Sequence, residues 1–223
     1  MDLGEKMNYT DAKQMVHQTA LQLNGANLIR LSAGNISFRT QDGMVAITPS
    51  GVPYAGMVPE DIVVIDLDGN IVDAVEGRKP SSEYLLHTSI LKRLPDVNAV
   101  IHTHSYYAIT FAALDRELPP VCIELLITGG PIPVAPYALP GTVEVGEIAA
   151  DILQERPELK GCLLKNHGMV SIGGSLKEAF AYASDIETGA RVYHQALQIG
   201  EPETIPEADI EAIRRKYNLI AKR

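Results

Sequence analysis

Two histidines separated by one residue, His102 and His104, end an apolar run over 98–101. Because side chains two positions apart in a β-strand point to the same face, both imidazoles would meet at the end of a buried strand. Burying two adjacent imidazoles without a shared partner costs free energy, which favours a metal site over ordinary core histidines. A third candidate, His167, follows another apolar run over 162–164. Three neutral histidines that leave one position open are typical of a catalytic zinc ion.

The carboxylate of Glu83 is the candidate for a fourth ligand. Its motif, Pro80-Ser81-Ser82-Glu83, opens a helix predicted over 81–94. A carboxylate in a first helical turn is stabilised by the helix dipole by about 0.3–1 kcal/mol, so a purely structural role is one interpretation. The other makes Glu83 a zinc ligand, or a base that leaves the metal when substrate binds. We assign His87, one turn further along, a structural role or a role behind the ligands.

Three short loops rich in glycine, serine and asparagine are candidates for binding a phosphate. Backbone N–H groups in such loops can approach an anion closely, especially beside a helix N-terminus. Ordinary turns and helix caps have the same composition, which is the alternative for any one loop. The motifs are Ser32-Ala33-Gly34-Asn35, Thr48-Pro49-Ser50-Gly51 and Pro80-Ser81-Ser82-Glu83.

Composition limits the function classes open to these 223 residues. A hydrophobic content of 46% and a charged content of 21% describe a globular protein with a sizeable core. The net charge of −9 argues against a broad nucleic-acid surface. We expect no signal peptide, no membrane span and a cytoplasmic location. The isolated Cys122 and Cys162 fit a reducing compartment, and we interpret both as buried apolar residues.

Periodicity and turn residues predict an α/β fold. Helices are predicted over 12–23, 81–94, 105–114, 142–156, 176–199 and 207–218, and strands over 36–39, 44–47, 62–67, 70–73, 99–102, 121–127, 133–137, 162–164 and 169–172. Asp42-Gly43 and Asp68-Gly69 are predicted hairpin turns. This order predicts one domain over 1–223, a three-layer α/β/α sandwich around a mixed, largely antiparallel sheet. His17 and His194 lie in predicted helices, and we expect both to be exposed.

Five motifs in this order and spacing resemble the signature of the class II aldolase/adducin family. They are Ser-Ala-Gly-Asn-Ile-Ser at 32–37, Thr-Pro-Ser-Gly-Val at 48–52, Pro-Ser-Ser-Glu at 80–83, His-Thr-His at 102–104 and Asn-His-Gly at 166–168. The resemblance covers nearly the whole chain. Within the family the motifs are most similar to those of the L-fuculose-1-phosphate aldolase branch.

The resemblance implies a site, a reaction and an assembly. It implies one Zn²⁺ per subunit held by His102, His104 and His167, with Glu83 as a ligand at rest and a proton shuttle in turnover. The implied reaction is reversible cleavage of a ketose 1-phosphate, such as L-fuculose 1-phosphate or a 5-deoxypentulose 1-phosphate, to dihydroxyacetone phosphate and a small aldehyde. It also implies a C4-type homotetramer with sites between subunits. The implied phosphate contacts are Gly34, Asn35, Ser50, Gly51, Ser81 and Ser82.

Individual positions refine the branch within the family. The related ribulose-5-phosphate 4-epimerases carry Asp at the position of Glu83, which favours an aldolase. Fuculose aldolases use a tyrosine in a stretch that here reads Val-Cys-Ile-Glu-Leu-Leu over 121–126, which leaves the aldehyde half and its proton donor open. A second family tyrosine matches Tyr217, to which we assign a catalytic role. Lys165 could form a Schiff base, but we interpret it as a neighbour of a metal ligand.

Other members of the family supply the alternatives. A 4-epimerase, a methylthioribulose-1-phosphate dehydratase and a tetronate-phosphate decarboxylase would use similar phosphorylated substrates. The adducin branch uses the fold as an interaction module without catalysis. The presence of all three histidines and Glu83 argues against that last alternative.

Overall fold

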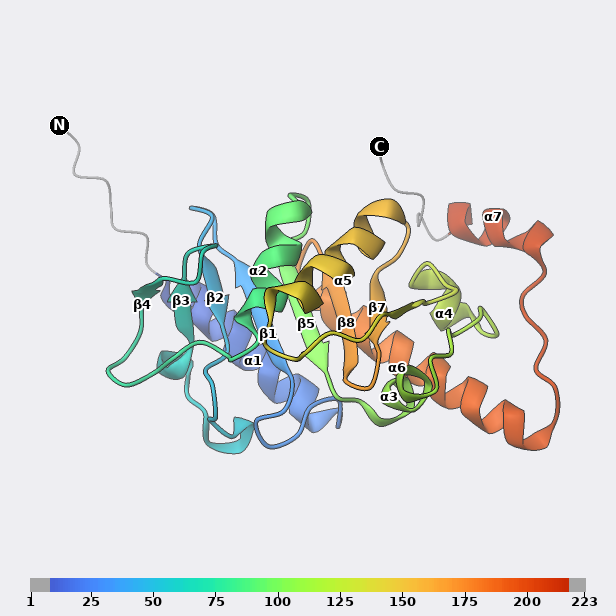
Figure 1. The fold of residues 1–223 in the computed structure, drawn as a ribbon, viewed down its shortest axis with the longest axis horizontal. Coiled ribbons are helices and arrows are strands. Elements are labelled where there is room, and N and C mark those ends of the chain that lie inside the picture. The colour runs from blue at the N-terminus through green and yellow to red at the C-terminus, as the bar shows by residue number, and fades with distance from the viewer. Residues whose placement is uncertain (1–8, 217–223) are drawn as a thin grey trace.

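The computed structural model describes residues 9–216, whose strands form one eight-stranded sheet (Figure 1). The spatial order is β4-β3-β2-β1-β5-β8-β7-β6. The strands are β1 (Asn35–Arg39), β2 (Val45–Ile47), β3 (Val63–Ile65), β4 (Ile71–Asp73), β5 (Ala99–Thr103), β6 (Val134–Ala135), β7 (Gly161–Leu164) and β8 (Gly168–Gly173). Neighbouring strands pair antiparallel, except for the parallel pair β6–β7. The sheet is therefore mixed and largely antiparallel, as predicted.

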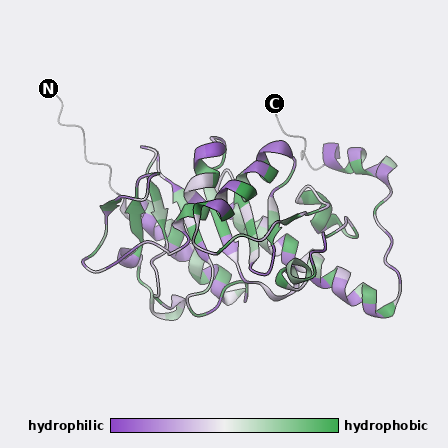
Figure 2. Cartoon of the chain, viewed as in Figure 1, coloured by the Kyte–Doolittle hydropathy of each residue, from purple (hydrophilic) through white to green (hydrophobic). Residues whose placement is uncertain are grey.

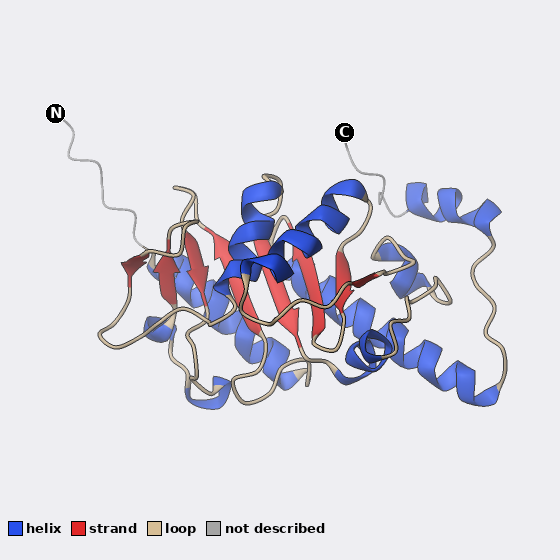
Figure 3. Cartoon of the chain, viewed as in Figure 1, coloured by secondary structure: helices blue, strands red, loops and turns tan. Residues whose placement is uncertain are grey.

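Helices cover both faces of the sheet (Figures 1 and 3). On one face, α2 (Tyr84–Arg93) and α5 (Val143–Glu155) pack against each other. On the other, α1 (Thr10–Gly25) lies against β1 and β2, and α6 (Leu176–Ile199) against β5 and β8. The remaining helices are α3 (Tyr106–Ala113), α4 (Ile123–Ile127), α7 (Glu207–Lys216) and two 3₁₀ turns, Tyr54–Gly56 and Pro59–Asp61. This arrangement confirms the three-layer fold.

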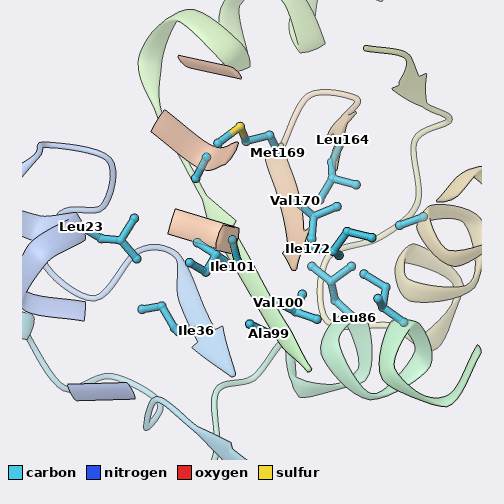
Figure 4. Packing of buried hydrophobic residues seen from close by; sticks show 14 of the residues in the cluster. Leu23, Ile36, Leu86, Ala99, Val100, Ile101, Leu164, Met169, Val170 and Ile172 are labelled. Atoms are coloured by element: carbon cyan, nitrogen blue, oxygen red, sulfur yellow. The ribbon is translucent and has the colours of Figure 1, made fainter. Parts of the chain in front are cut away.

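The central strands are buried on both faces because helices cover each side. Figure 4 shows Ile101 of β5 and Val170 of β8 among buried apolar residues that include Leu23 of α1 and Leu86 of α2. Burying each such side chain contributes about 1.5–3 kcal/mol relative to leaving it exposed. In Figure 2 the outer faces of the helices carry hydrophilic residues, drawn in purple. The continuous apolar runs in the sequence thus correspond to the central strands of the sheet. The candidate site residues lie at the ends of these strands.

One predicted strand is wrong. The segment predicted as a strand over 121–127 contains the helix α4. A short apolar run fits a buried strand and a buried helix equally well, so periodicity does not separate them. Packing decides here: the neighbouring residues Leu125 and Leu126 are both buried, and Leu125 fills the space beside Gly189 of α6. The other long predicted elements are observed within a few residues, although the strand predicted over 133–137 is only Val134–Ala135.

Candidate metal centre and active site

The three histidines meet at one end of the central strand pair β5–β8. His102 faces Val170 across this antiparallel pair, and His104 comes just after the last residue of β5. His167 directly precedes β8, so it lies at the same end of the sheet. The ring centroids of His102 lie 4.9 Å from those of His104 and 4.6 Å from those of His167. The sheet register therefore gathers residues that are more than sixty positions apart.

Gly168 allows this close approach of the strands. A Cβ atom at this position would lie 2.3 Å from the carbonyl oxygen of Thr103, 3.1 Å from His102 Cε1 and 3.3 Å from His104 Cδ2. Real Cβ contacts essentially never fall below 3.0 Å. The glycine of the Asn-His-Gly motif thus makes room for two imidazoles from the neighbouring strand.

Glu83 brings a carboxylate to the three rings. Its Oε1 lies 2.9 Å from His167 Nε2, and its Oε2 lies 3.4 Å from His102 Nε2. The Nε2 atoms of His102 and His104 are 2.9 Å apart. One donor atom from each of the four residues lies within 4.8 Å of the others, close enough for all four to reach one divalent cation. Three imidazole nitrogens and a carboxylate oxygen form a donor set that suits zinc.

The protonation of His102 fits a role as a ligand. Its Nδ1 lies 2.9 Å from the carbonyl oxygen of Met169, so Nδ1–H donates there and the Nε2 lone pair faces the other rings. Burial lowers the pKa of His102 to about 3, although the charge of Glu83 opposes this. Burial also lowers the pKa of His104. Both rings are neutral at neutral pH, which is the form that binds metal.

Glu83 sits at the start of α2 rather than inside it. The helix begins at Tyr84, so the prediction that Glu83 lies in the first helical turn is wrong by one position. Ser81 Oγ accepts the Glu83 N–H at 3.3 Å and thereby satisfies a donor that has no partner within the helix. Burial of Glu83 acts to raise its pKa, but contacts with His167, His102 and Asn35 outweigh it and hold the pKa below its ordinary value. The carboxylate is therefore ionised.

A buried chain of hydrogen bonds continues from Glu83 into the core. Asn35 Nδ2 donates to Glu83 Oε2 at 2.8 Å, and Asn35 Oδ1 contacts His87 Nε2. At the far side of the ring, Ser37 Oγ lies 2.7 Å from His87 Nδ1. Burial lowers the pKa of His87 to about 4. His87 thus lies behind the candidate ligands and is neutral.

Sequence reasoning missed the part that Asn35 and Ser37 play in this chain. A signal was present: two polar residues alternate along an otherwise apolar strand, so they share a face. What the sequence does not give is the packing of α2 against that face, which brings the imidazole of His87 between them.

The three candidate phosphate loops lie side by side at the same end of the sheet. Asn35 pairs with His102 across β1–β5, which sets the first loop beside the histidines. The Ser81 N–H donates to the Thr48 carbonyl at 3.0 Å and joins the second and third loops. Tyr54 OH donates to the Gly34 carbonyl at 2.6 Å.

These loops differ in what they leave accessible. Gly34 and Gly51 have φ of +83° and +71°, a conformation that favours glycine. Ser50, Gly51 and Ser82 are exposed, whereas Ser81 and Asn35 are buried. The Asn35 amide is already bound to Glu83 and His87, so in this structure its side chain is a partner of the carboxylate.

Two further residues stand out in the sequence, Tyr217 and Lys165. Tyr217 lies outside the described residues. Lys165 pairs with Asp115 at 2.5 Å, so a carboxylate holds its ammonium group.

His17 and His194 are less exposed than the sequence suggests. Both are half-buried: His17 Nε2 is 2.8 Å from the Met57 carbonyl, and the ring of His194 packs against that of Tyr107. Their helices are covered by neighbouring segments that the helical period alone does not reveal. Of the two cysteines, Cys162 is buried as expected and Cys122 only partly.

Comparisons with known proteins agree with the motifs. The family model described as "Class II Aldolase and Adducin N-terminal domain" matches residues 14–194. A 5-deoxy-D-ribulose 1-phosphate aldolase of Bacillus thuringiensis serovar kurstaki is 38% identical over 193 residues, which cover 86% of this chain and 88% of that protein. A 5-methylthioribulose-1-phosphate/5-deoxyribulose-1-phosphate aldolase of Rhodospirillum rubrum is 39% identical over 199 residues, covering 89% of this chain and 87% of that protein.

A solved structure is similar over almost the whole chain. It is titled L-fuculose 1-phosphate aldolase, has a TM-score of 0.88 and is 32% identical in sequence. The match covers 96% of this chain and all of the other. Fold, motifs and the family model all lead to one assignment: the chain belongs to the class II aldolase/adducin family.

Proposed function

We propose that the protein is a zinc-dependent aldolase that reversibly cleaves a ketose 1-phosphate to dihydroxyacetone phosphate and a small aldehyde. The observation that carries the proposal is the convergence of three imidazoles and the Glu83 carboxylate within 4.8 Å. The relatives named as aldolases of phosphorylated ketoses support the same reaction.

The residues divide the chemistry between them. A divalent cation held by His102, His104 and His167 would supply Lewis-acid stabilisation of negative charge on substrate oxygens, worth several kcal/mol. Glu83 is ionised and borders the cluster, so its carboxylate oxygen can take a proton from the reacting substrate carbon in the condensation direction and return that proton in the cleavage direction. Glu83 therefore has two roles, as a ligand at rest and as a proton carrier during turnover.

The clustered loops would hold the substrate phosphate. Candidate contacts are Gly34, Asn35, Ser50, Gly51, Ser81 and Ser82. Gly51 is exposed at a positive φ, so its backbone can approach an anion, and the start of α2 adds the positive end of a helix dipole. An acidic protein can bind an anion in this way because the donors act locally.

For the aldehyde half we favour a 5-deoxypentulose 1-phosphate over L-fuculose 1-phosphate. The stretch 121–126 has no tyrosine, and it contains most of the short helix α4 instead of a strand. Both relatives quoted above carry 5-deoxyribulose 1-phosphate in their names. Tyr217 stays our candidate for a second catalytic side chain.

A substrate panel tests the activity. The zinc-loaded protein is given 5-deoxyribulose 1-phosphate, 5-methylthioribulose 1-phosphate or L-fuculose 1-phosphate, and dihydroxyacetone phosphate is measured with a coupled dehydrogenase. We expect cleavage of the first to be fastest. If no ketose 1-phosphate yields dihydroxyacetone phosphate, the proposal is wrong, and product masses reduced by water or carbon dioxide would instead indicate a dehydratase or a decarboxylase.

We further propose a homotetramer with active sites between subunits, located in the cytoplasm. Large apolar side chains are exposed beside the site: Leu31 precedes the first loop, Tyr106 follows His104, and Leu139 lies two residues before Gly141, which approaches Ser82.

Two free cysteines support a reducing compartment. Within residues 9–216, the structure has no helix of sufficient length and apolar character to cross a bilayer. Light scattering at micromolar concentration tests the tetramer, and a monomeric mass would contradict it.

A further inference from the structure

We propose that His87 is a positioning residue that aims the Glu83 carboxylate at the metal centre through the amide of Asn35. This inference deepens the proposed function and rests on it. It concerns the two residues that lie behind the candidate ligands, to which neither the motifs nor the relatives' names assign this task.

The hydrogen bonds that link Ser37, His87, Asn35 and Glu83 all run in one direction, from donor to acceptor toward Glu83. An ionised carboxylate only accepts, so the Asn35 atom that faces Glu83 at 2.8 Å is the NH₂ group. The opposite atom, Asn35 Oδ1, accepts in turn, and His87 Nε2 must therefore carry the hydrogen.

The tautomer of His87 is fixed at its other nitrogen. With the hydrogen on Nε2, Nδ1 is an acceptor, and Ser37 Oγ donates to it at 2.7 Å. Ser37 donates to His87, His87 to Asn35, and Asn35 to Glu83. Reversing the Asn35 amide would place its carbonyl oxygen against the carboxylate and its NH₂ group against the His87 N–H.

Burial makes this order strict. Ser37 and His87 have no exposed surface, and Asn35 is only 3% exposed. Water therefore does not replace a lost partner, and a buried polar group left unsatisfied costs free energy. These hydrogen bonds also join two elements. Asn35 and Ser37 belong to β1, whereas His87 lies in α2, one turn after Glu83.

As a consequence, the two carboxylate oxygens of Glu83 have different partners. Asn35 holds Oε2, and Oε1 faces His167 at 2.9 Å. Without the amide, the carboxylate would rotate about its own side-chain bonds, and its mean position would move away from the imidazoles. His87 thus affects the metal centre although it touches none of the candidate ligands.

Two substitutions at one position test the relay. His87→Met fills the space without a hydrogen-bond donor, whereas His87→Gln offers an amide N–H near the place of Nε2. We expect His87→Met to weaken Zn²⁺ binding by about tenfold or more, the range typical for partners behind metal ligands, and His87→Gln to restore most of it. Competition with a chromophoric chelator measures the affinity without any substrate.

A double-mutant cycle separates positioning from a general structural effect. In a Glu83→Ala background the carboxylate is gone, so His87→Met should cause no further loss of Zn²⁺ affinity. An equal loss in both backgrounds would overturn the proposal, because His87 would then act without Glu83. In steady-state kinetics we expect kcat to fall in His87→Met while KM for the ketose phosphate stays nearly unchanged.

Controls keep the test informative if a variant folds poorly. Ser37→Ala removes only the donor to His87 Nδ1 and should weaken Zn²⁺ binding in the same direction by a smaller factor, so it carries the cycle if His87→Met does not fold. Unchanged affinity in Ser37→Ala and His87→Met together, with both folded, would also overturn the proposal. If the wild-type protein binds no Zn²⁺ or cleaves no ketose phosphate, the proposed function fails first; if it does both and the cycle is additive, only the role of His87 fails.

Discussion

The four candidate ligands are held with different rigidity. His102 lies within a central strand, and His104 and His167 lie one residue beyond strands whose backbones are paired. Glu83 instead lies outside the sheet, at the N-cap of α2, and Asn35 holds its side chain. It is therefore the ligand whose movement disturbs the least backbone, which suits a group that must both bind and leave.

The substitution Glu83→Gln tests this division. The amide still offers an oxygen to the cluster but cannot carry the proton, so we expect a loss of turnover of at least 100-fold with retained metal. Steady-state kinetics and the zinc content of the purified variant measure the two effects. Unchanged turnover would rule out the proton role, and loss of zinc would show that Glu83 is needed as a ligand first.

Gly168 provides a second test at the scale of a residue. In Gly168→Ala the new methyl group would meet the Thr103 carbonyl and push against the rings of His102 and His104. We expect a lower melting temperature and Zn²⁺ affinity reduced by tenfold or more. Gly56→Ala is the matched control, because a Cβ there meets nothing within 4 Å and no positive φ is involved. Equal behaviour of the two variants would contradict the packing argument.

The identity of the candidate ligands could be predicted from the sequence. The hydrogen bonds that hold Glu83 in place, through Asn35, could not. The spacing of His102 and His104 already requires a shared face, and the Asn-His-Gly turn stands out beside an apolar strand. The relay through Asn35 depends on how α2 packs across β1. That contact joins residues about fifty positions apart and leaves no periodic signal.

At the scale of elements, the sequence predicts well wherever local rules decide. Hairpin glycines such as Gly43 and Gly69 adopt the positive φ that their turns require, and the long helices α5 and α6 follow their apolar period. The segment with α4 fails because its apolar run is short and tertiary packing chooses the helix. The start of α2 shifts to Tyr84 because Glu83 has the non-helical backbone of an N-cap residue.

The packing of α2 on β1 makes stability depend on pH through His87. Its pKa is about 4 in the folded protein, because of burial, and about 6.5 when exposed. Between these values the unfolded chain binds more protons, so stability is fully present above pH 6.5 and falls as the pH drops toward 4. The loss from this one residue is roughly 3 kcal/mol at most.

Urea unfolding of the metal-free protein at pH 7 and pH 4.5 measures this effect. His87→Gln has no titrating group there, so the loss of stability between the two pH values should be smaller in the variant than in the wild type. All other titrating groups are shared by the two proteins and cancel in the comparison. An equal loss in both would contradict the assignment of the buried neutral imidazole.

At the scale of the whole molecule, the site assembles only when the sheet is complete. Glu83, the His102–His104 pair and His167 come from separate parts of the chain, and the unfolded chain offers no comparable donor set. A metal that binds the native state alone stabilises it by about 2.7 kcal/mol at a free concentration 100 times its Kd. For a chain of this length we expect the melting temperature to rise by roughly 5–10 °C.

Calorimetry with zinc and with a chelator measures this shift. His104→Ala removes one donor at a partly exposed position and is the appropriate control. Its melting temperature should respond far less to zinc. A wild-type protein that melts at the same temperature in both conditions would show that the cluster does not bind the ion in the folded state.

The register of β5 against β8 has one more consequence. This pair is the line where the strands β4-β3-β2-β1-β5, from the first half of the chain, meet β8-β7-β6 from the second half. His102 and His104 stand on one side of that line and His167 on the other. A bound ion would therefore cross-link the two halves, and its removal should speed deuterium uptake by amides along this seam, such as Ile101 and Ser171, far more than by those of β2 and β3.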